Sequence, residues 1–371
     1  MKKKILFIIW SYSYGGGAEK VLSQIVNNLN EKKYDISILE FYHTNIKKEK
    51  TNDNITILPP IIDANNTNGF LRKIYNLSIY FFPFLLRKKI PNDYDVEIAF
   101  NYQIPTFLLH KDKKSICWVH GAPLDLKSSV LKRYLQRNAY YRTNAIVPIA
   151  KLTENTLNEV FPEYKNKMYP IYNGYDFDLM NIQSKKTIDI EIENNSITFC
   201  GRLTDGKNPL ELLQVVKKIH EKGIEVHLYL LGDGNLKESI IKRSKDYEIE
   251  KYVHLLGYIE NPYPIISKSK LIVMLSKGEG FPTVFVEGMY FGKPFVSTYV
   301  GGCEELSQNG KNGFIIENID DCANKIYDLL TNKNLYLEMS NSCKEYIDRF
   351  SISNQINEIE KLIDKVLEEE E

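Results

Sequence analysis

The sequence predicts an α/β protein built from two Rossmann-like, doubly wound domains that face each other across a cleft. Short apolar runs, typical of buried parallel strands, alternate with segments of helical periodicity along the chain. The 371 residues exceed the roughly 250–300 at which a single core stops growing. The alternation is interrupted once, by the weakly patterned polar stretch 176–196, which we interpret as a linker.

The expected elements follow from these patterns in chain order. In the first half, strands are expected at 4–10, 35–41, 55–58, 96–100, 115–120, 145–149 and 168–171, with helices at 18–30 and 126–142. In the second half, strands are expected at 197–201, 225–231, 253–256, 271–275 and 294–297, with helices at 210–222, 235–244 and 283–290. The predicted domains span 1–173 and 174–349, and a helix at about 350–371 is expected to pack back on the first.

Composition is that of an ordinary globular protein, but charge is unevenly distributed. Formal net charge is zero, yet residues 1–173 carry 25 Lys and Arg against 15 Asp and Glu. The remainder has the opposite excess, so the two halves are expected to have different partners. The five cysteines include no CxxC pair, which favours reduced thiols in a cytoplasmic protein over a disulfide framework.

Two segments bear on membrane contact. The start, "MKKKILFIIW", has a shorter apolar run than a signal peptide, and we interpret it as a first strand. No run reaches the roughly 18 apolar residues of a membrane span. Residues 70–90 combine aromatic and aliphatic side chains with five Lys and Arg, which fits either an interfacial helix on anionic lipid or a partly buried helix with solvated ends.

The stretch "SKGEGFPTVFVEG" at 276–288 carries two glutamates around a Gly-Phe-Pro corner. A helix is expected to begin near Phe281, with Pro282 in its first turn, so that nearby N–H groups point at a ligand. Glu287 then lies on the same helix face as Thr283. Carboxylates accept hydrogen bonds from paired hydroxyls, so Glu279 and Glu287 suit two sugar-like diols beside a bound anion; two ordinary surface acids are the alternative.

Three other motifs follow predicted strands. In "CGRLTDGKNP", Arg202 and Lys207 could clamp a diphosphate, or form a solvated basic loop. In "GGGAEK", Gly16 and Gly17 suit either a phosphate loop or a plain turn, and the Walker and dinucleotide fingerprints are both incomplete. His120 in "WVHG" is either structural or functional.

Weaker signals are glycine corners and acidic pairs. Gly232 lies in "LLGDG", Gly257 and Tyr258 lie in "LLGYIE", and Glu304 and Glu305 follow a third corner in "VGGCEEL". The acidic pairs are Asp93 with Asp95, Asp176 with Asp178, and Asp320 with Asp321. None of these pairs follows a strand, so no metal site is predicted.

Taken together, the motifs resemble those of retaining glycosyltransferases of the GT-B fold, in family 4, whose hallmark is an E-x7-E pair such as Glu279 and Glu287. "GGAEK", "HG", "NG" at the hinge, "GRL…KNP", "GDG" and "HLLG" fall in register with that group. The resemblance covers nearly the whole chain and is most specific over 200–314. One departure is that the family's "GG-x-x-E" pattern usually has an apolar residue or Pro before the acid; here Glu304 and Glu305 both follow Cys303.

The resemblance also implies roles, with acceptor binding by the domain at 1–173 and donor binding by the domain at 174–349. Arg202 and Lys207 would bind the donor diphosphate, Glu287 the ribose hydroxyls, and Glu279 the transferred sugar. His120 would contact that sugar near its reacting carbon. The remaining donor-binding residues that it implies are Gly16, Gly17, Gly232, Gly257, Tyr258, Gly280, Phe281, Pro282 and Thr283. No metal or other cofactor is expected, and retention would proceed by front-face attack.

We therefore expect a transferase that moves a hexose or N-acetylhexosamine from a nucleotide diphosphate sugar to a glycan acceptor, with UDP as the expected nucleotide. A lipid-linked acceptor of surface polysaccharide synthesis and a peripheral position on the cytosolic face of a membrane are expected if residues 70–90 contact lipid. Two alternatives are a nucleotide-sugar epimerase on the same fold and a non-catalytic partner subunit that keeps the pocket.

Overall fold

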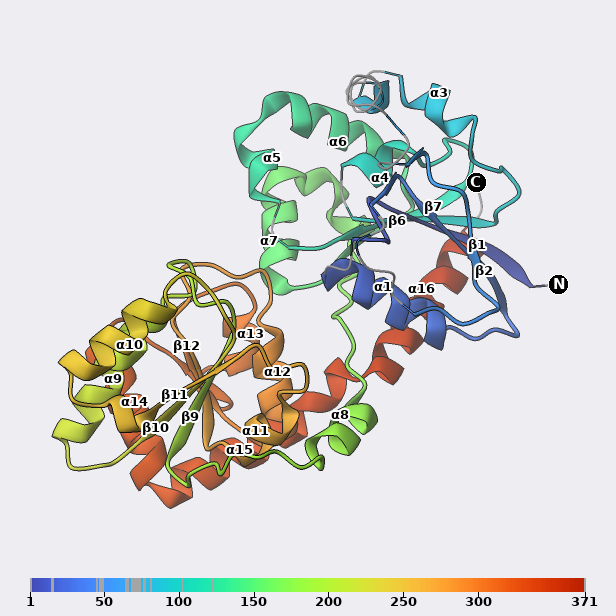
Figure 1. Ribbon diagram of the computed structural model, residues 1–371. Helices are drawn as coiled ribbons and strands as arrows, with labels where there is room; N and C mark the ends of the chain where they lie inside the picture. Colours follow the sequence, from blue (N-terminus) through green and yellow to red (C-terminus); the bar gives the residue numbers. More distant parts are fainter. Residues whose placement is uncertain are drawn as a thin grey trace. The chain divides into compact units, whose positions relative to one another are not determined.

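The structure is a computed structural model that describes residues 2–14, 17–44, 46, 50–63, 67, 75, 78–80, 82–101, 103–121 and 123–369. The chain forms two compact units. Unit 1 comprises Met1–Tyr175 and Ile352–Glu371, and unit 2 comprises Asp176–Ser351. The predicted α/β class with two parallel sheets is confirmed (Figure 1).

Within its described residues, unit 1 contains a parallel sheet of six strands in the order β4-β2-β1-β6-β7-β8. A short parallel ladder joins β3 to β5. Its strands are β1 (Lys3–Ile9), β2 (Tyr34–Glu40), β3 (Tyr42–His43), β4 (Thr56–Ile57), β5 (Ile62–Asp63), β6 (Val96–Phe100), β7 (Lys114–Val119) and β8 (Ala145–Pro148). Its helices are α1 (Gly17–Asn28), α3 (Pro83–Arg87), α4 (Ile104–Phe107), α5 (Leu124–Ser128), α6 (Val130–Arg142), α7 (Lys151–Val160), η1 (Pro162–Lys167) and α16 (Ile352–Glu368).

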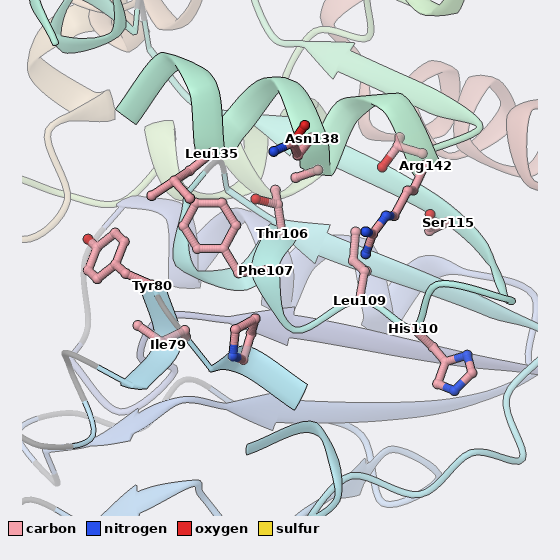
Figure 2. A pocket seen from close by; sticks show the side chains of 13 residues that line it. Ile79, Tyr80, Thr106, Phe107, Leu109, His110, Ser115, Leu135, Asn138 and Arg142 are labelled. Carbon is pink, nitrogen blue, oxygen red and sulfur yellow. The ribbon is translucent and has the colours of Figure 1, made fainter. Parts of the chain in front are cut away.

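A cavity of about 180 Å³ lies in unit 1, where α6 passes over α4. Leu135 and Arg142 of α6 line it on one side, and Ile79 and Tyr80 line it on the other, with Phe107 of α4 between them (Figure 2). This cavity is separate from the carboxyl ends of the strands, where the sequence motifs lie.

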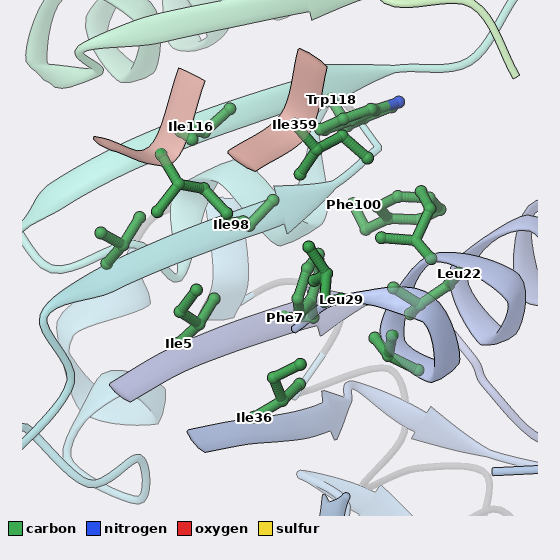
Figure 3. Packing of buried hydrophobic residues seen from close by; sticks show 14 of the residues in the cluster. Ile5, Phe7, Leu22, Leu29, Ile36, Ile98, Phe100, Ile116, Trp118 and Ile359 are labelled. Carbon is green, nitrogen blue, oxygen red and sulfur yellow. The ribbon is translucent and has the colours of Figure 1, made fainter. Parts of the chain in front are cut away.

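The C-terminal helix α16 completes the core of unit 1. Its apolar residues recur at helical spacing, and Ile359 and Ile363 are buried in the same cluster as Phe7 of β1 and Ile98 of β6 (Figure 3). The Glu360 carboxylate accepts hydrogen bonds from the backbone N–H of Asn30 and from Lys33. The chain therefore returns to unit 1 after tracing unit 2.

Within its described residues, unit 2 also contains a six-stranded parallel sheet, in the order β11-β10-β9-β12-β13-β14. Its strands are β9 (Ser196–Cys200), β10 (His227–Leu231), β11 (Val253–Gly257), β12 (Leu271–Met274), β13 (Phe295–Ser297) and β14 (Gly313–Ile315). Its helices are α8 (Phe177–Ser184), α9 (Pro209–Glu221), α10 (Lys237–Asp246), η2 (Glu250–Tyr252), α11 (Tyr263–Lys268), α12 (Thr283–Tyr290), α13 (Cys303–Ser307), α14 (Ile319–Thr331), α15 (Lys333–Tyr346) and η3 (Ile347–Phe350).

Two expectations about the hinge region are wrong. The predicted strand at 168–171 forms only an isolated bridge at Met168, and Pro170, which has no N–H group, cannot donate to a ladder. The predicted linker contains helix α8. Asp176 caps this helix by accepting a hydrogen bond from Leu179 N. One member of the acidic pair Asp176 and Asp178 therefore serves as a helix cap.

Candidate active site

A cavity of about 540 Å³ opens at the carboxyl ends of neighbouring strands in unit 2. Parallel strands end at the same edge of a sheet, so the segments that follow β9, β10, β11 and β12 meet there. The lining residues are Cys200, Gly201, Arg202, Lys207, Leu231, Gly232, Asp233, Tyr258, Ile259, Pro262, Met274, Glu279, Phe281, Pro282, Thr283, Val284 and Glu287. The structure thus brings most of the predicted donor-binding residues into one cavity.

Two predicted residues, Lys207 and Glu279, form an ion pair in this cavity. Their side chains are 24% and 15% exposed, so the pair is only partly screened by water. Backbone bonds fix the loop that carries Lys207: Lys207 N donates to Thr204 O, and Lys277 N donates to Gly206 O. A lysine held at a cavity wall by one carboxylate is available to a second anion.

Glu287 enters the cavity from helix α12 and is half-buried. Burial raises the pKa of the Tyr263 hydroxyl on α11, and the nearby Glu287 carboxylate raises it further. Burial and the same carboxylate also raise the pKa of the Cys200 thiol. Glu287 therefore places negative charge at the part of the cavity wall that α12 forms, where a ligand hydroxyl would donate to it.

Helix α12 begins later than the sequence suggested. Its first residue is Thr283, and Pro282 is the N-cap with an extended ψ of 92°. The expected start at Phe281 is wrong, because a proline drives the residue before it out of the helical region. The Thr283 N–H therefore belongs to the helix N-terminus, while Gly280 and Phe281 lie in the preceding loop.

Close backbone packing shapes the floor of the cavity. Gly232 follows β10 with φ +143°, and a Cβ atom built there would lie 1.9 Å from Gly201 O. Gly232 N donates to Gly257 O, and Gly201 N donates to Leu231 O, so the sheet's bonding continues past the strand ends. A side chain at Gly232 would force β9 and β10 apart at the cavity floor.

We expect Gly232→Ala to lower the free energy of unfolding by about 2–4 kcal/mol, through steric overlap with Gly201 and the unfavourable φ. Urea unfolding would measure this. Gly278→Ala is the matched control, because a Cβ at Gly278 meets nothing within 4 Å. Equal stability of the two variants would contradict the packing argument.

The other predicted donor-binding residues of unit 2 differ in how they meet the cavity. Tyr258 lines the cavity but is 79% exposed, whereas Gly257 and Gly280 are absent from the cavity wall. Arg202 lines it with an exposed side chain. Glu304 bonds to Tyr299 on the surface and, like Glu305, does not line the cavity.

The predicted site residues of the first half lie in unit 1. Gly17 begins helix α1 and is exposed, and Gly16 lies outside the described residues. His120 follows β7, and its ring packs against Phe100 with centroids 4.6 Å apart. Its Nε2 is buried and has no hydrogen-bond partner among the described residues. An imidazole nitrogen in that position suits a ligand hydroxyl.

Burial lowers the pKa of His120 to about 4. The unfolded chain binds this proton near pH 6.5, so it takes up more protons than the folded chain below that pH. We expect the free energy of unfolding to gain nothing further from this group above pH 6.5, and to lose about 3 kcal/mol as pH falls to 4. Denaturant titrations of wild type and His120→Gln over this range measure the effect; parallel pH profiles would contradict it.

Sequence reasoning missed several residues at both sites. Asp233, Ile259 and Pro262 line the unit 2 cavity, and the "GDG" motif already contained Asp233 as a signal. In unit 1, the buried Glu40 carboxylate accepts hydrogen bonds from Tyr12 N, Ser13 N and Ser13 Oγ. Glu40 thereby anchors the segment that leads to the glycines before α1.

The acidic pairs make ordinary structural contacts. Lys4 binds Asp93 through its side chain and Asp95 through its backbone N–H, and Asp320 pairs with Lys218. Over the part of the chain that the structure describes, no group of three or more His, Cys, Asp or Glu side chains is arranged to hold a metal ion.

Among the same residues, no helix is long and apolar enough to cross a membrane.

Two six-stranded parallel sheets, with a cavity at the carboxyl ends of the second, are the architecture of an α/β protein with two Rossmann-like units. Residues 182–350, which include this cavity, match the family model "Glycosyl transferases group 1". The chain is a glycosyltransferase, so the predicted enzyme class and the resemblance to group 1 glycosyltransferases are confirmed, while the assignment to family 4 stays a prediction.

Known proteins resemble the chain over nearly its full length. It is 26% identical to an uncharacterized glycosyltransferase of Methanocaldococcus jannaschii, with 98% of each chain covered. It is also 26% identical to a Campylobacter jejuni enzyme named as a GalNAc-GalNAc-diNAcBac-PP-undecaprenol α-1,4-N-acetylgalactosaminyltransferase, over 98% of this chain and 99% of that one. The Anabaena protein HepE, solved in complex with UDP, has a TM-score of 0.72 at 18% identity, with 98% and 100% covered.

Proposed function

We propose that the chain is a retaining glycosyltransferase that moves a hexose or N-acetylhexosamine from a UDP-sugar to a lipid-linked glycan. The observation that carries this proposal is the cavity in which Arg202, Lys207, Glu279 and Glu287 meet. Two cations and two carboxylates in one cavity match a ligand with a central diphosphate and a diol at each end. A nucleotide diphosphate sugar has that chemistry.

Each residue then has a distinct part in donor binding. Arg202 and Lys207 neutralise the diphosphate and stabilise the charge that develops on the leaving group. Glu287 accepts hydrogen bonds from the ribose hydroxyls. Glu279 accepts hydrogen bonds from the transferred sugar, next to the Thr283 N–H at the start of α12. The cations supply what a metal ion would otherwise supply, so we propose metal-independent turnover.

Retention is proposed to proceed on one face of the sugar. The bond between the anomeric carbon and the diphosphate oxygen breaks, and the acceptor oxygen bonds to that carbon from the same side. The acceptor's proton passes to the departing phosphate oxygen. Glu279 is engaged by Lys207, which favours a positioning role over that of a covalent nucleophile.

The comparisons support the choice of donor and acceptor. The HepE protein, which shares the fold, was solved with UDP, and the Campylobacter relative is named for transfer to an undecaprenol-linked glycan. By analogy we propose UDP as the nucleotide and a lipid-linked glycan of surface polysaccharide synthesis as the acceptor, reached from the cytosolic face of a membrane.

The test is a panel of UDP-, GDP- and ADP-sugars with EDTA present, in which release of the nucleoside diphosphate is measured. We expect slow release from one UDP-sugar, without metal, and faster release with an undecaprenol-linked glycan. An epimerase would instead release free sugar at a rate that the acceptor does not change. Release that depends on added metal would contradict the proposed chemistry.

A further inference from the structure

Helices α3 and α6 of unit 1 carry large apolar side chains that are exposed to solvent. Phe82, Phe84 and Leu85, at and beside α3, are each half or more exposed, and so are Leu131 and Tyr134 of α6. Single exposed apolar residues are common, but several from adjoining elements usually mark a docking surface. These residues make no contribution to the cavity of unit 2.

The cavity of unit 1 joins these two sets of residues into one surface. Pro83 of α3 lines it between Phe82 and Phe84, and Leu135 of α6 lines it one helical turn from Leu131. Tyr80 and Phe107 meet edge to face inside it, with ring centroids 5.8 Å apart. The indentation therefore lies between the exposed apolar residues of α3 and those of α6, and this surface is here called the α3–α6 face.

The charge of this face is one-sided. Residues 82–89 and 130–142 together contain seven Lys and Arg and no Asp or Glu. Three of these cations are already paired: the buried Arg87 with Glu97, Lys132 with Asp125, and Arg137 with Glu163. By contrast, the exposed Lys88 and Arg142 form no ion pair with any described residue, and Arg142 lines the indentation. These cations are available to an external anion.

We propose that the α3–α6 face docks on an anionic phospholipid bilayer. Phe82, Phe84, Leu85, Leu131 and Tyr134 would enter the boundary between headgroups and acyl chains, while Lys88, Lys89 and Arg142 contact lipid phosphates. Apolar burial and attraction of basic residues to an anionic surface act together. A second copy of the chain fits less well, because two such cationic faces would repel each other.

The inference goes beyond the proposed function and does not require the proposed donor to be right. It extends the proposal in one respect, since a lipid-linked acceptor is confined to a bilayer, and docking would bring the enzyme to it. Vesicle binding needs neither donor nor acceptor. Failure of the binding experiment therefore differs from failure of the transfer assay.

The experiment is cosedimentation of the full chain with vesicles of phosphatidylcholine alone, and of phosphatidylcholine mixed with phosphatidylglycerol. We expect binding to the mixed vesicles only, weakened by salt. Leu131→Ser with Tyr134→Ser, and separately Lys88→Glu with Arg142→Glu, should each lower the bound fraction about tenfold or more. Circular dichroism checks that the variants fold.

The matched control is Leu179→Ser with Ile182→Ser on α8 of unit 2, where both side chains are also exposed and apolar. This variant should bind vesicles like wild type. The proposal is overturned if wild type binds neither vesicle, if it binds both equally, or if the control loses as much binding as the α6 variant. Concentration-dependent dimerisation without vesicle binding would assign the face to a second copy instead.

Discussion

Glu287→Ala is expected to lower kcat/KM for the donor about 100-fold or more while the fold is retained. The carboxylate lies half-buried in the unit 2 cavity, where a pair of ligand hydroxyls would donate to it. Hydrogen bonds to a charged group contribute about 1.5–3 kcal/mol each, and every 1.4 kcal/mol is about tenfold in affinity or rate. Loss of two such bonds gives the stated effect.

Glu304→Ala is the matched control, since Glu304 is an exposed acid of the same unit that does not line the cavity. Nucleoside diphosphate release measures turnover, and circular dichroism reports the fold. Near-normal turnover by Glu287→Ala, with a wild-type spectrum, would remove Glu287 from the site.

The two partners of the Lys207–Glu279 ion pair are expected to have opposite effects on UDP binding. Lys207→Ala removes a cation from the diphosphate position, so UDP affinity should fall about 10- to 100-fold. Glu279→Gln releases Lys207 from its carboxylate and removes a negative charge, so UDP should bind as well as to wild type or better. Turnover of the UDP-sugar by Glu279→Gln should nevertheless fall about 100-fold, because the contact to the sugar is lost.

Isothermal calorimetry with UDP, beside a turnover assay, separates these effects. Lys277→Ala is the control for Lys207→Ala, because Lys277 is an exposed lysine close in the fold that does not line the cavity. If both partner variants weaken UDP binding equally, the ion pair acts only as part of the loop's structure, and Lys207 has no direct contact with the diphosphate.

Much of unit 2 could be predicted from the sequence, because its motifs combine local patterns with a topological rule. The glycine corners and the cations each follow an apolar run, and parallel strands bring such positions to one edge. Glu279 and Glu287 meet the same cavity because one precedes α12 and the other lies on it. The start of α12 was misplaced, since the influence of Pro282 on Phe281 competes with the helical pattern.

The remainder depends on contacts that sequence spacing does not encode. The Lys207–Glu279 pair joins residues 72 positions apart, so only the folded loops reveal it. Glu40 has no motif of its own, and its role comes from the backbone of Tyr12 and Ser13. The exposure of Leu131 and Tyr134 on α6 depends on which face of that helix the core leaves uncovered, and helical spacing alone does not reveal it.

The central claim is that the unit 2 cavity holds a nucleotide diphosphate sugar between its cations and its carboxylates. A crystal structure of the chain with UDP tests this most directly. We expect the ribose hydroxyls within about 3.2 Å of the Glu287 carboxylate and the diphosphate oxygens within a similar distance of Lys207 Nζ and the Arg202 guanidinium. UDP bound elsewhere, or in this cavity with its diphosphate away from both cations, would contradict the account.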